Sequence, residues 1–153
     1  MAKKPRPSRY KEHWTILLIE NDANRQQWIE THSPGNVRYR TIRRGQIGLE
    51  VITHMRPNDY SALMLDCDLD EGLQAGAEAD FNGVEIAKLL VRHAPSRQPV
   101  LVLSHNGAGA ARMVMVLESN GFDVTRIPFQ DLTEEKLREW LMEVEEELGI
   151  EWT

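Results

Sequence analysis

Apolar and polar residues alternate along the chain in blocks that predict five strands, each followed by a helix. Three short runs are apolar almost throughout, namely residues 15–20 (TILLIE), 61–66 (SALMLD) and 99–104 (PVLVLS). This pattern is typical of strands that are buried on both faces of a sheet. Residues 37–42 (VRYRTI) alternate instead and predict an outer strand, and residues 122–129 (FDVTRIPF) predict a fifth strand.

The segments between these strands repeat apolar residues at the spacing of an α-helix. Helices are therefore predicted over residues 22–32, 45–55, 81–94, 107–121 and 131–149. Buried strands that are joined by helices require a parallel sheet with right-handed crossovers. The predicted fold class is α/β, a single flavodoxin-like (βα)5 domain. Its doubly wound parallel sheet has strand order 2-1-3-4-5, numbered along the chain.

Two of the helix ends have recognisable capping residues. Gly121 is predicted at the C′ position of the fourth helix. Asp131 is expected to cap the last helix, with Glu134 three residues later as its capping-box partner. Five residues are expected to form the buried face of this last helix: Leu137, Trp140, Leu141, Val144 and Leu148.

Composition places the chain among globular proteins. Apolar residues make up 41% and charged residues 27% of its 153 residues, enough for one domain with a core. No apolar run approaches the ~20 residues that span a bilayer, and no secretory signal follows the first residues. Cys67 is the only cysteine, which excludes an intramolecular disulfide and fits a reducing cytoplasm. The net charge of −6 argues against nucleic-acid binding over the whole surface.

Charge is distributed unevenly, and this suggests the domain boundaries. Residues 1–13 are basic and contain prolines, and they are expected to form a flexible arm. The folded domain is expected to cover residues 14–149, and residues 150–153 form a tail. We expect the protein to be cytoplasmic and without contact to membranes.

Polar side chains gather where the predicted buried strands end. In a parallel sheet these carboxyl ends share one edge, and ligands bind there, between the first and third strands. Crowded carboxylates repel one another unless a cation holds them together, and hard oxygen ligands suit Mg²⁺. The polar residues at the ends of the first, third and fourth strands are Glu20, Asn21, Asp22, Asp66, Asp68 and Ser104.

Four stretches in this order resemble the receiver domain of two-component response regulators. They are TILLIENDANR (15–25), RPNDYSALMLDCDL (56–69), NGVEIAKLLVRHAPSRQPVLVLSHN (82–106) and RIPF (126–129). Their order and spacing together are more specific than any one of them. The resemblance covers residues 15–148, nearly the whole chain.

The resemblance implies a role for each matching residue. Asp66 would be the phosphoacceptor and Ser104 the hydroxyl that binds the phosphoryl group. Glu20 and Asn21 would stand in the acidic pair that binds Mg²⁺ together with Asp66, and the backbone carbonyl of Asp68 would be another ligand. The physical logic is that Mg²⁺ neutralises charge on the phosphoryl group and orients it for attack by the carboxylate.

The implied function is that of a stand-alone receiver module rather than an enzyme. Its only expected chemistry is its own phosphorylation, with a histidine kinase or a phosphotransfer protein as the donor. The signal is expected to leave through the face formed by the helix 107–121, the strand 122–129 and the last helix. The partner on this face is a downstream protein or a second copy of the chain.

One departure from the family concerns the cation of the site. The family has a lysine just before the proline that follows the last strand, but this chain has Ile127 before Pro128. Arg126 is adjacent, yet successive side chains of a strand point to opposite faces. Arg126 could replace the lysine only through a bulge or a change of register.

Other departures weaken the expected metal site. Asn21 replaces the second acid, and the loop is about one residue short, so Asp22 is an alternative ligand. Residues 70–82 form an enlarged, acidic loop with no assigned role. His105 follows the switch hydroxyl and could shape the access of water to Asp66. Two hypotheses remain: a receiver that is phosphorylated on Asp66, and a pseudo-receiver that binds partners regardless of phosphorylation.

A function of another class also fits part of the acidic pattern. Glu20 on one strand, Asp66 and Asp68 on another, and Gly72 after them resemble the Toprim site of primases and topoisomerases, which uses Mg²⁺ for phosphodiester chemistry. The glycine expected just after the glutamate is Asn21 here, and the chain as a whole is acidic. The stretches around Ser104 fit a receiver better.

Overall fold

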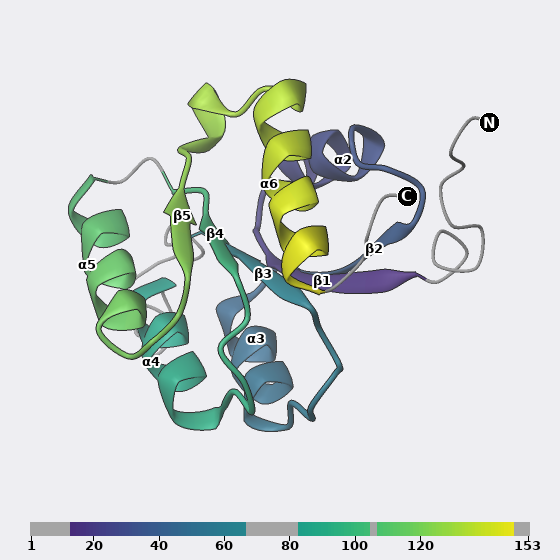
Figure 1. Ribbon diagram of the computed structural model, residues 1–153. Coiled ribbons are helices and arrows are strands. Elements are labelled where there is room, and N and C mark those ends of the chain that lie inside the picture. The colour runs from purple at the N-terminus through teal and green to yellow at the C-terminus, as the bar shows by residue number, and fades with distance from the viewer. Residues whose placement is uncertain (1–12, 67–82, 105–106, 149–153) are drawn as a thin grey trace.

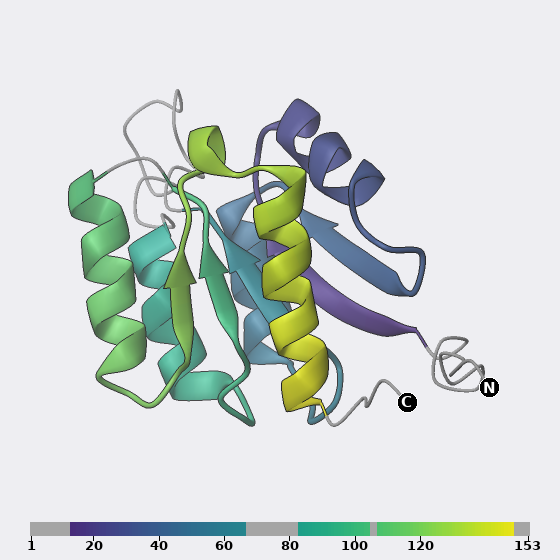
Figure 2. The same cartoon turned by 45° about the horizontal axis from the view of Figure 1, so that its top comes forward.

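The computed structural model describes residues 13–66, 83–104 and 107–148. Within these ranges the strands form one parallel sheet in the order β2-β1-β3-β4-β5, as the sequence predicts. The strands are β1 (Trp14–Ile19), β2 (Val37–Ile42), β3 (Ala62–Leu65), β4 (Val100–Val102) and β5 (Val124–Arg126). Their arrowheads point toward the same edge, and the short 3-10 helix η2 (Phe129–Asp131) lies beyond the end of β5 (Figure 2).

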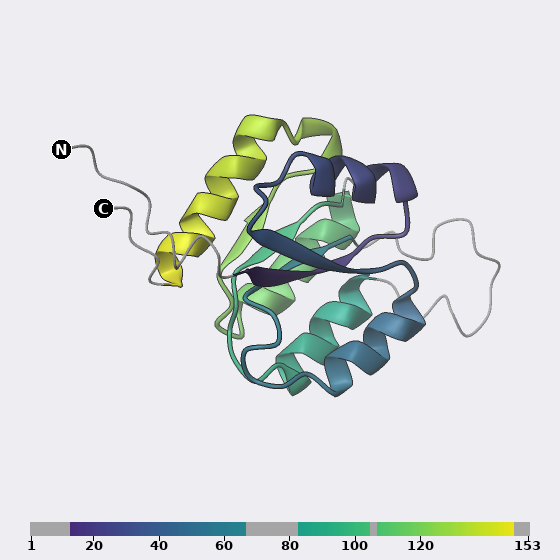
Figure 3. The same cartoon turned by 90° about the vertical axis from the view of Figure 1, so that its right-hand side faces the viewer.

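Helices cover both faces of the sheet. Figures 1 and 3 show α2 and α6 on one face, and α3, α4 and α5 on the other. None of these helices is long and apolar enough to cross a membrane within the described ranges. The helices are α2 (Ala23–Thr31), α3 (Gly45–Thr53), α4 (Gly83–His93), α5 (Gly107–Glu118) and α6 (Glu134–Glu147).

The two layers of helices explain the continuous apolar runs in the sequence. Along β1, Ile16 and Leu18 pack in the cluster beneath α2 and α6, whereas Leu17 and Ile19 pack in the cluster beneath α3, α4 and α5. All four side chains are fully buried. A strand with a helix layer on each side has no solvent face, so nearly every position along it is apolar, with Thr15 as the exception in β1.

The ends of several elements differ from the prediction. Asp131 belongs to η2, and the side chain of Thr133 caps α6 by accepting a hydrogen bond from the Lys136 amide at 3.1 Å. Leu148 was expected in the buried face of α6, but it is 40% exposed because the helix ends at Glu147. The other four residues of that face are buried.

The start of β1 is fastened to the last turns of α6. The indole Nε1 of Trp14 donates to Oε2 of Glu145 at 3.1 Å, and Nδ2 of Asn36 donates to the same oxygen at 3.1 Å. Glu145 is buried, so these two donors compensate for the water that its carboxylate loses. The two ends of the described chain therefore lie together.

Gly121 ends α5 in the backbone conformation that its predicted C′ position requires. Its φ is +93°, and its N–H donates to the Glu118 carbonyl at 3.1 Å. The next residue, Phe122, donates to the Leu117 carbonyl at 3.1 Å and is buried. A Cβ atom at residue 121 would meet only Arg97 atoms, at ordinary contact distance. Glycine is therefore favoured here by the backbone conformation and not by lack of space.

We predict that Gly121→Ala lowers the free energy of unfolding by about 1–2 kcal/mol, because residues other than glycine are strained at positive φ. Urea denaturation measures the loss. Gly35→Ala is the matched control, since nothing lies within 4 Å of its added methyl group and its φ is not positive. Equal stability of the two variants would show that α5 does not depend on this turn.

Candidate functional site

Parallel pairing brings Glu20 and Asp66 to the same edge of the sheet. Ile19 of β1 lies opposite Leu65 of β3, and the Asp66 N–H donates to the Ile19 carbonyl at 3.1 Å. Glu20 follows Ile19, so the two acids are the first residues beyond neighbouring strands. Their exposed fractions are 0% and 1%. Ser104, which follows the neighbouring strand β4, is also fully buried.

Arg25 supplies the positive charge at this pair of acids. Its Nη1 lies 3.6 Å from Oδ2 of Asp66 and 3.9 Å from Oε1 of Glu20. These distances describe an ion pair without direct hydrogen bonds. The Arg25 side chain is 25% exposed, so one side of the guanidinium still meets water.

Arg25 occupies an unusual position for a cation. It lies in the first turn of α2, where the helix dipole disfavours positive charge by roughly 0.3–1 kcal/mol. No sequence pattern predicted a role for Arg25. A basic residue at a helix start, five residues after a buried glutamate, was the signal that could have indicated one.

Asp22 fixes the start of α2 and thereby the position of Arg25. Its Oδ1 accepts hydrogen bonds from the amides of Asn24 at 2.8 Å and Arg25 at 3.1 Å. Asp22 is exposed, and the structure places its carboxylate in helix capping rather than against Asp66. Asn21, the other candidate beside Glu20, is partly exposed.

Gln26 supports the backbone of the acidic residue. Its side-chain amide donates to the carbonyl of Glu20, and its Oε1 accepts from Nε of Arg43 at 3.2 Å. Gln26 is 5% exposed, which is unusual for a glutamine. Gln26 was not predicted from the sequence, since an isolated polar side chain on a helix belongs to no apolar pattern.

Burial changes the charge state of the acidic pair. Loss of water, and then the negative charge of Asp66, raise the pKa of Glu20 from 4.5 to about 8. The Asp22 amide, which donates to Oε2 of Glu20 at 3.1 Å, and the Arg25 guanidinium act in the opposite direction. Burial therefore favours the protonated form of Glu20 at neutral pH, which reduces the negative charge beside Arg25.

Position 127, for which the sequence resemblance implies a lysine, is apolar in its surroundings as well as in its residue type. Ile127 packs against the cluster beneath α2 and α6, and its N–H donates to the Val102 carbonyl at 3.0 Å. Arg126 is exposed at the end of β5. Asp68, His105 and the enlarged loop 70–82 lie outside the residues that the structure describes.

The pair of acids suits Mg²⁺ in the kind of ligand it offers. Oε1 of Glu20 is buried and accepts no hydrogen bond from a described residue, so it faces a position where a cation is favourable. Carboxylate oxygens are the ligands that Mg²⁺ prefers. Among the described residues, however, no group of three or more His, Cys, Asp or Glu is placed to hold a metal.

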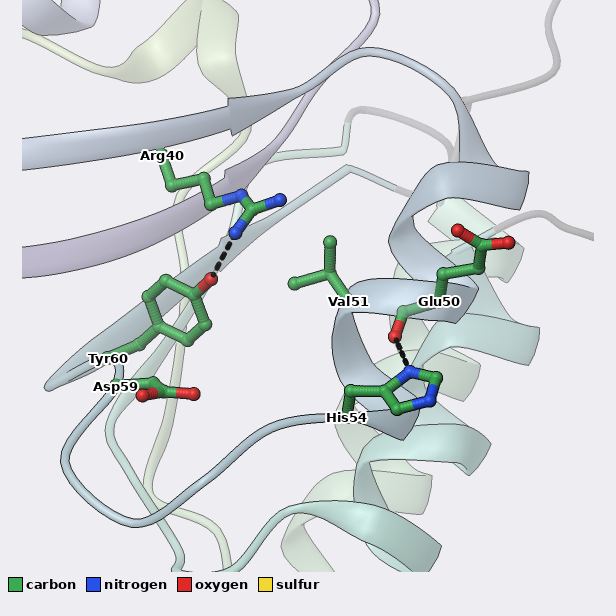
Figure 4. A pocket seen from close by; sticks show the side chains of 6 residues that line it. All are labelled: Arg40, Glu50, Val51, His54, Asp59 and Tyr60. Atoms are coloured by element: carbon green, nitrogen blue, oxygen red, sulfur yellow. Dashed lines mark hydrogen bonds between the residues drawn. The ribbon is translucent and has the colours of Figure 1, made fainter.

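A surface pocket lies apart from this edge, between β2, α3 and the segment before β3 (Figure 4). In it, Arg40 donates to the Tyr60 hydroxyl at 3.3 Å, and Nδ1 of His54 contacts the Glu50 carbonyl at 2.9 Å. Asp59 accepts a hydrogen bond from the Arg56 amide at 2.8 Å. Because these polar groups are already hydrogen-bonded to other groups of the protein, we take the Glu20–Asp66 pair rather than this pocket as the candidate site.

Solved structures of receiver domains have the same fold as this chain. The response regulator domain of Thermotoga maritima CheB is 14% identical, with a TM-score of 0.62, covering 92% of this chain and 99% of that domain. The non-phosphorylated HemR receiver domain of Leptospira biflexa is 23% identical, with a TM-score of 0.60, covering 86% and 93%.

A third similar structure is described with a metal. The receiver domain of a sensor histidine kinase from Pseudomonas aeruginosa PAO1, with magnesium coordinated in its active-site cleft, is 19% identical with a TM-score of 0.61. The match covers 86% of this chain and 96% of that domain. No family model and no curated protein sequence matches the chain. The fold is that of CheY-like response-regulator receiver domains.

We predict that the raised pKa of Glu20 makes stability depend on pH. Between about pH 4.5 and 8 the folded protein keeps a proton that the unfolded chain loses, so the free energy of unfolding falls as pH rises. Glu20→Gln removes this contribution. Its stability relative to wild type should rise by up to about 5 kcal/mol across the window, since one pKa unit corresponds to about 1.4 kcal/mol.

Denaturation in chelator at a series of pH values measures this effect. Glu139→Gln, on the exposed face of α6, is the control and should follow wild type at every pH. A constant difference between Glu20→Gln and wild type from pH 4.5 to 8 would contradict the prediction.

Proposed function

We propose that the chain is a receiver module of two-component signal transduction that accepts a phosphoryl group on Asp66. The observation that carries the proposal is the place of Asp66. It follows the central strand β3, is 1% exposed, and lies between the buried Glu20 and the end of β4 with Ser104. The receiver fold supports this role for the acid that ends the third strand.

The proposed reaction transfers a phosphoryl group from a phosphohistidine to Asp66. A carboxylate oxygen of Asp66 attacks the phosphorus, a P–O bond forms, and the P–N bond to the donor imidazole breaks. The electron pair of the P–N bond stays on the imidazole, which takes up one proton from water and leaves as the neutral ring. The Ser104 hydroxyl donates a hydrogen bond to the product phosphoryl group. Mg²⁺, bound by Glu20, Asp66 and the Asp68 backbone carbonyl, would neutralise charge on the phosphoryl oxygens.

In this function the module is a signalling protein rather than an enzyme with an external substrate. The donor is a histidine kinase or a phosphotransfer protein, in a cytoplasmic setting. The output face consists of α5, β5 and α6, the elements named for this role from the sequence. Met115 on α5 and Met142 on α6 are 66% and 54% exposed, which supports protein contact there.

The pseudo-receiver is the second candidate, and two observations favour it. Ile127 leaves the lysine position without a cation, and the charge of Arg25 already compensates the acids. Loss of a positioned charge typically costs about 10²–10³ in rate. A module of this kind would bind its partners in the same way with and without a phosphodonor. No observation in the described residues favours a Toprim-like, Mg²⁺-dependent activity on nucleic acids.

We predict that the protein gains the mass of one phosphoryl group on incubation with Mg²⁺ and a small phosphodonor such as phosphoramidate. Intact-protein mass spectrometry measures the gain. Asp66→Ala should show none, whereas the exposed Asp123→Ala should behave as wild type.

A wild-type protein that gains no mass, even with its cognate kinase, would identify the module as a pseudo-receiver. A gain that persists in Asp66→Ala would place the phosphoryl group on another residue.

A further inference from the structure

We propose that Arg25 is a tethered cation that competes with Mg²⁺ for the Glu20–Asp66 pair. The guanidinium lies within 4 Å of both carboxylates, so a metal ion bound between these oxygens would meet its charge directly. A metal can therefore bind tightly only when the Arg25 side chain turns away. The metal is that of the proposed function, but the role of Arg25 does not require phosphoryl transfer.

Charge balance is the first argument for this role. Two carboxylates that are almost fully buried need a positive charge nearby. The strand that carries the family's lysine offers Ile127 instead, packed among apolar residues. The two described ion pairs of the acids both come from Arg25. Arg25 thus supplies a positive charge to the acids, whereas Ile127 supplies none.

The geometry of the ion pair is the second argument. An arginine that holds a carboxylate firmly donates two parallel hydrogen bonds at about 2.7–2.9 Å. Here a single nitrogen, Nη1, approaches both acids at 3.6 and 3.9 Å. Mg²⁺ carries twice the charge and binds oxygen at about 2.0–2.1 Å. The ion pairs of Arg25 are thus weak enough for a metal to displace its guanidinium from the acids. The displacement lowers the affinity of the acids for the metal.

The third argument is that Arg25 has a second favourable contact. Its guanidinium carbon lies 5.2 Å from the centre of the Phe129 ring, a cation–π distance. Phe129 is fixed by its N–H, which donates to the Leu103 carbonyl at 2.9 Å, and by an edge-on contact with Trp28 at 5.7 Å. This contact exists beside the ion pairs and does not depend on the carboxylates, so Arg25 can keep it when a metal takes its place at the acids.

The test is a calorimetric titration of the full-length protein with MgCl₂, without any phosphodonor. Arg25→Gln removes the cation, and Arg25→Met also keeps an unbranched stem beside Phe129. Both should bind Mg²⁺ at least about tenfold more tightly than wild type, because a positive charge within 4 Å is gone. Arg25→Lys keeps the charge and should stay near wild type.

Arg112→Gln, an exposed arginine on α5, is the control for net charge and should bind Mg²⁺ as wild type does. Thermal unfolding gives an independent readout. In chelator, Arg25→Gln and Arg25→Met should unfold at lower temperature than wild type, since two buried carboxylates lose their cation. Mg²⁺ should raise their midpoints by more than it raises that of wild type.

Equal or weaker Mg²⁺ binding by the two neutral variants would overturn the proposal, as would undetectable binding by every form. Failure of both variants to fold even in Mg²⁺ would also reject it, since a metal could then not replace Arg25. The result separates the two proposals of function. If the neutral variants bind Mg²⁺ more tightly but Asp66 is never phosphorylated, the proposed role of Arg25 is supported and the proposed phosphoryl transfer is rejected.

Discussion

The pairing of β1 with β3 is the constraint on which the site depends. Ile19 and Leu65 lie opposite each other in the two central strands, so the residues that follow them must leave the sheet side by side. In this chain both residues are acids, and both are buried. The sheet thus forces two negative charges into a place with little water, and the surrounding residues have to make that arrangement tolerable.

Three different devices reduce this electrostatic cost. The raised pKa of Glu20 removes one charge at neutral pH. Arg25 lies within 4 Å of both acids, and the Asp22 amide provides Glu20 with a hydrogen bond. All three act from β1 and the start of α2, within six residues of the chain. The compensation is therefore local, in contrast to a lysine at position 127, beyond the end of β5, which the sequence resemblance implied.

The arrangement of the elements could be predicted from the sequence because it follows from burial. Continuous apolar runs identified β1, β3 and β4, and the alternating run identified β2 over the same six residues that the structure shows. The strand order followed from the rules for parallel sheets. The polar residues at the strand ends, Glu20, Asp66 and Ser104, could be chosen for the same reason.

Features that depend on single side chains were harder to predict. Asp131 and Thr133 are both good capping residues, and the sequence alone does not reveal that Asp131 lies within η2 and that Thr133 caps α6. Whether the Arg25 side chain can contact Glu20 and Asp66 depends on the residue at which α2 begins. A periodic pattern of apolar residues does not predict that contact. Ile127 was recognised as a departure, but the cation that compensates for it lies on another element.

The hydrogen bond between Trp14 and Glu145 has a practical consequence for work with this protein. It holds the beginning of β1 beside the end of α6, at the amino edge of the sheet. The acidic pair lies at the opposite, carboxyl edge. A surface anchor or fluorescent label attached just before Trp14 or just after Glu147 therefore starts far from Asp66. Protein immobilised in this way presents the whole Glu20–Arg25–Asp66 edge to partners in solution.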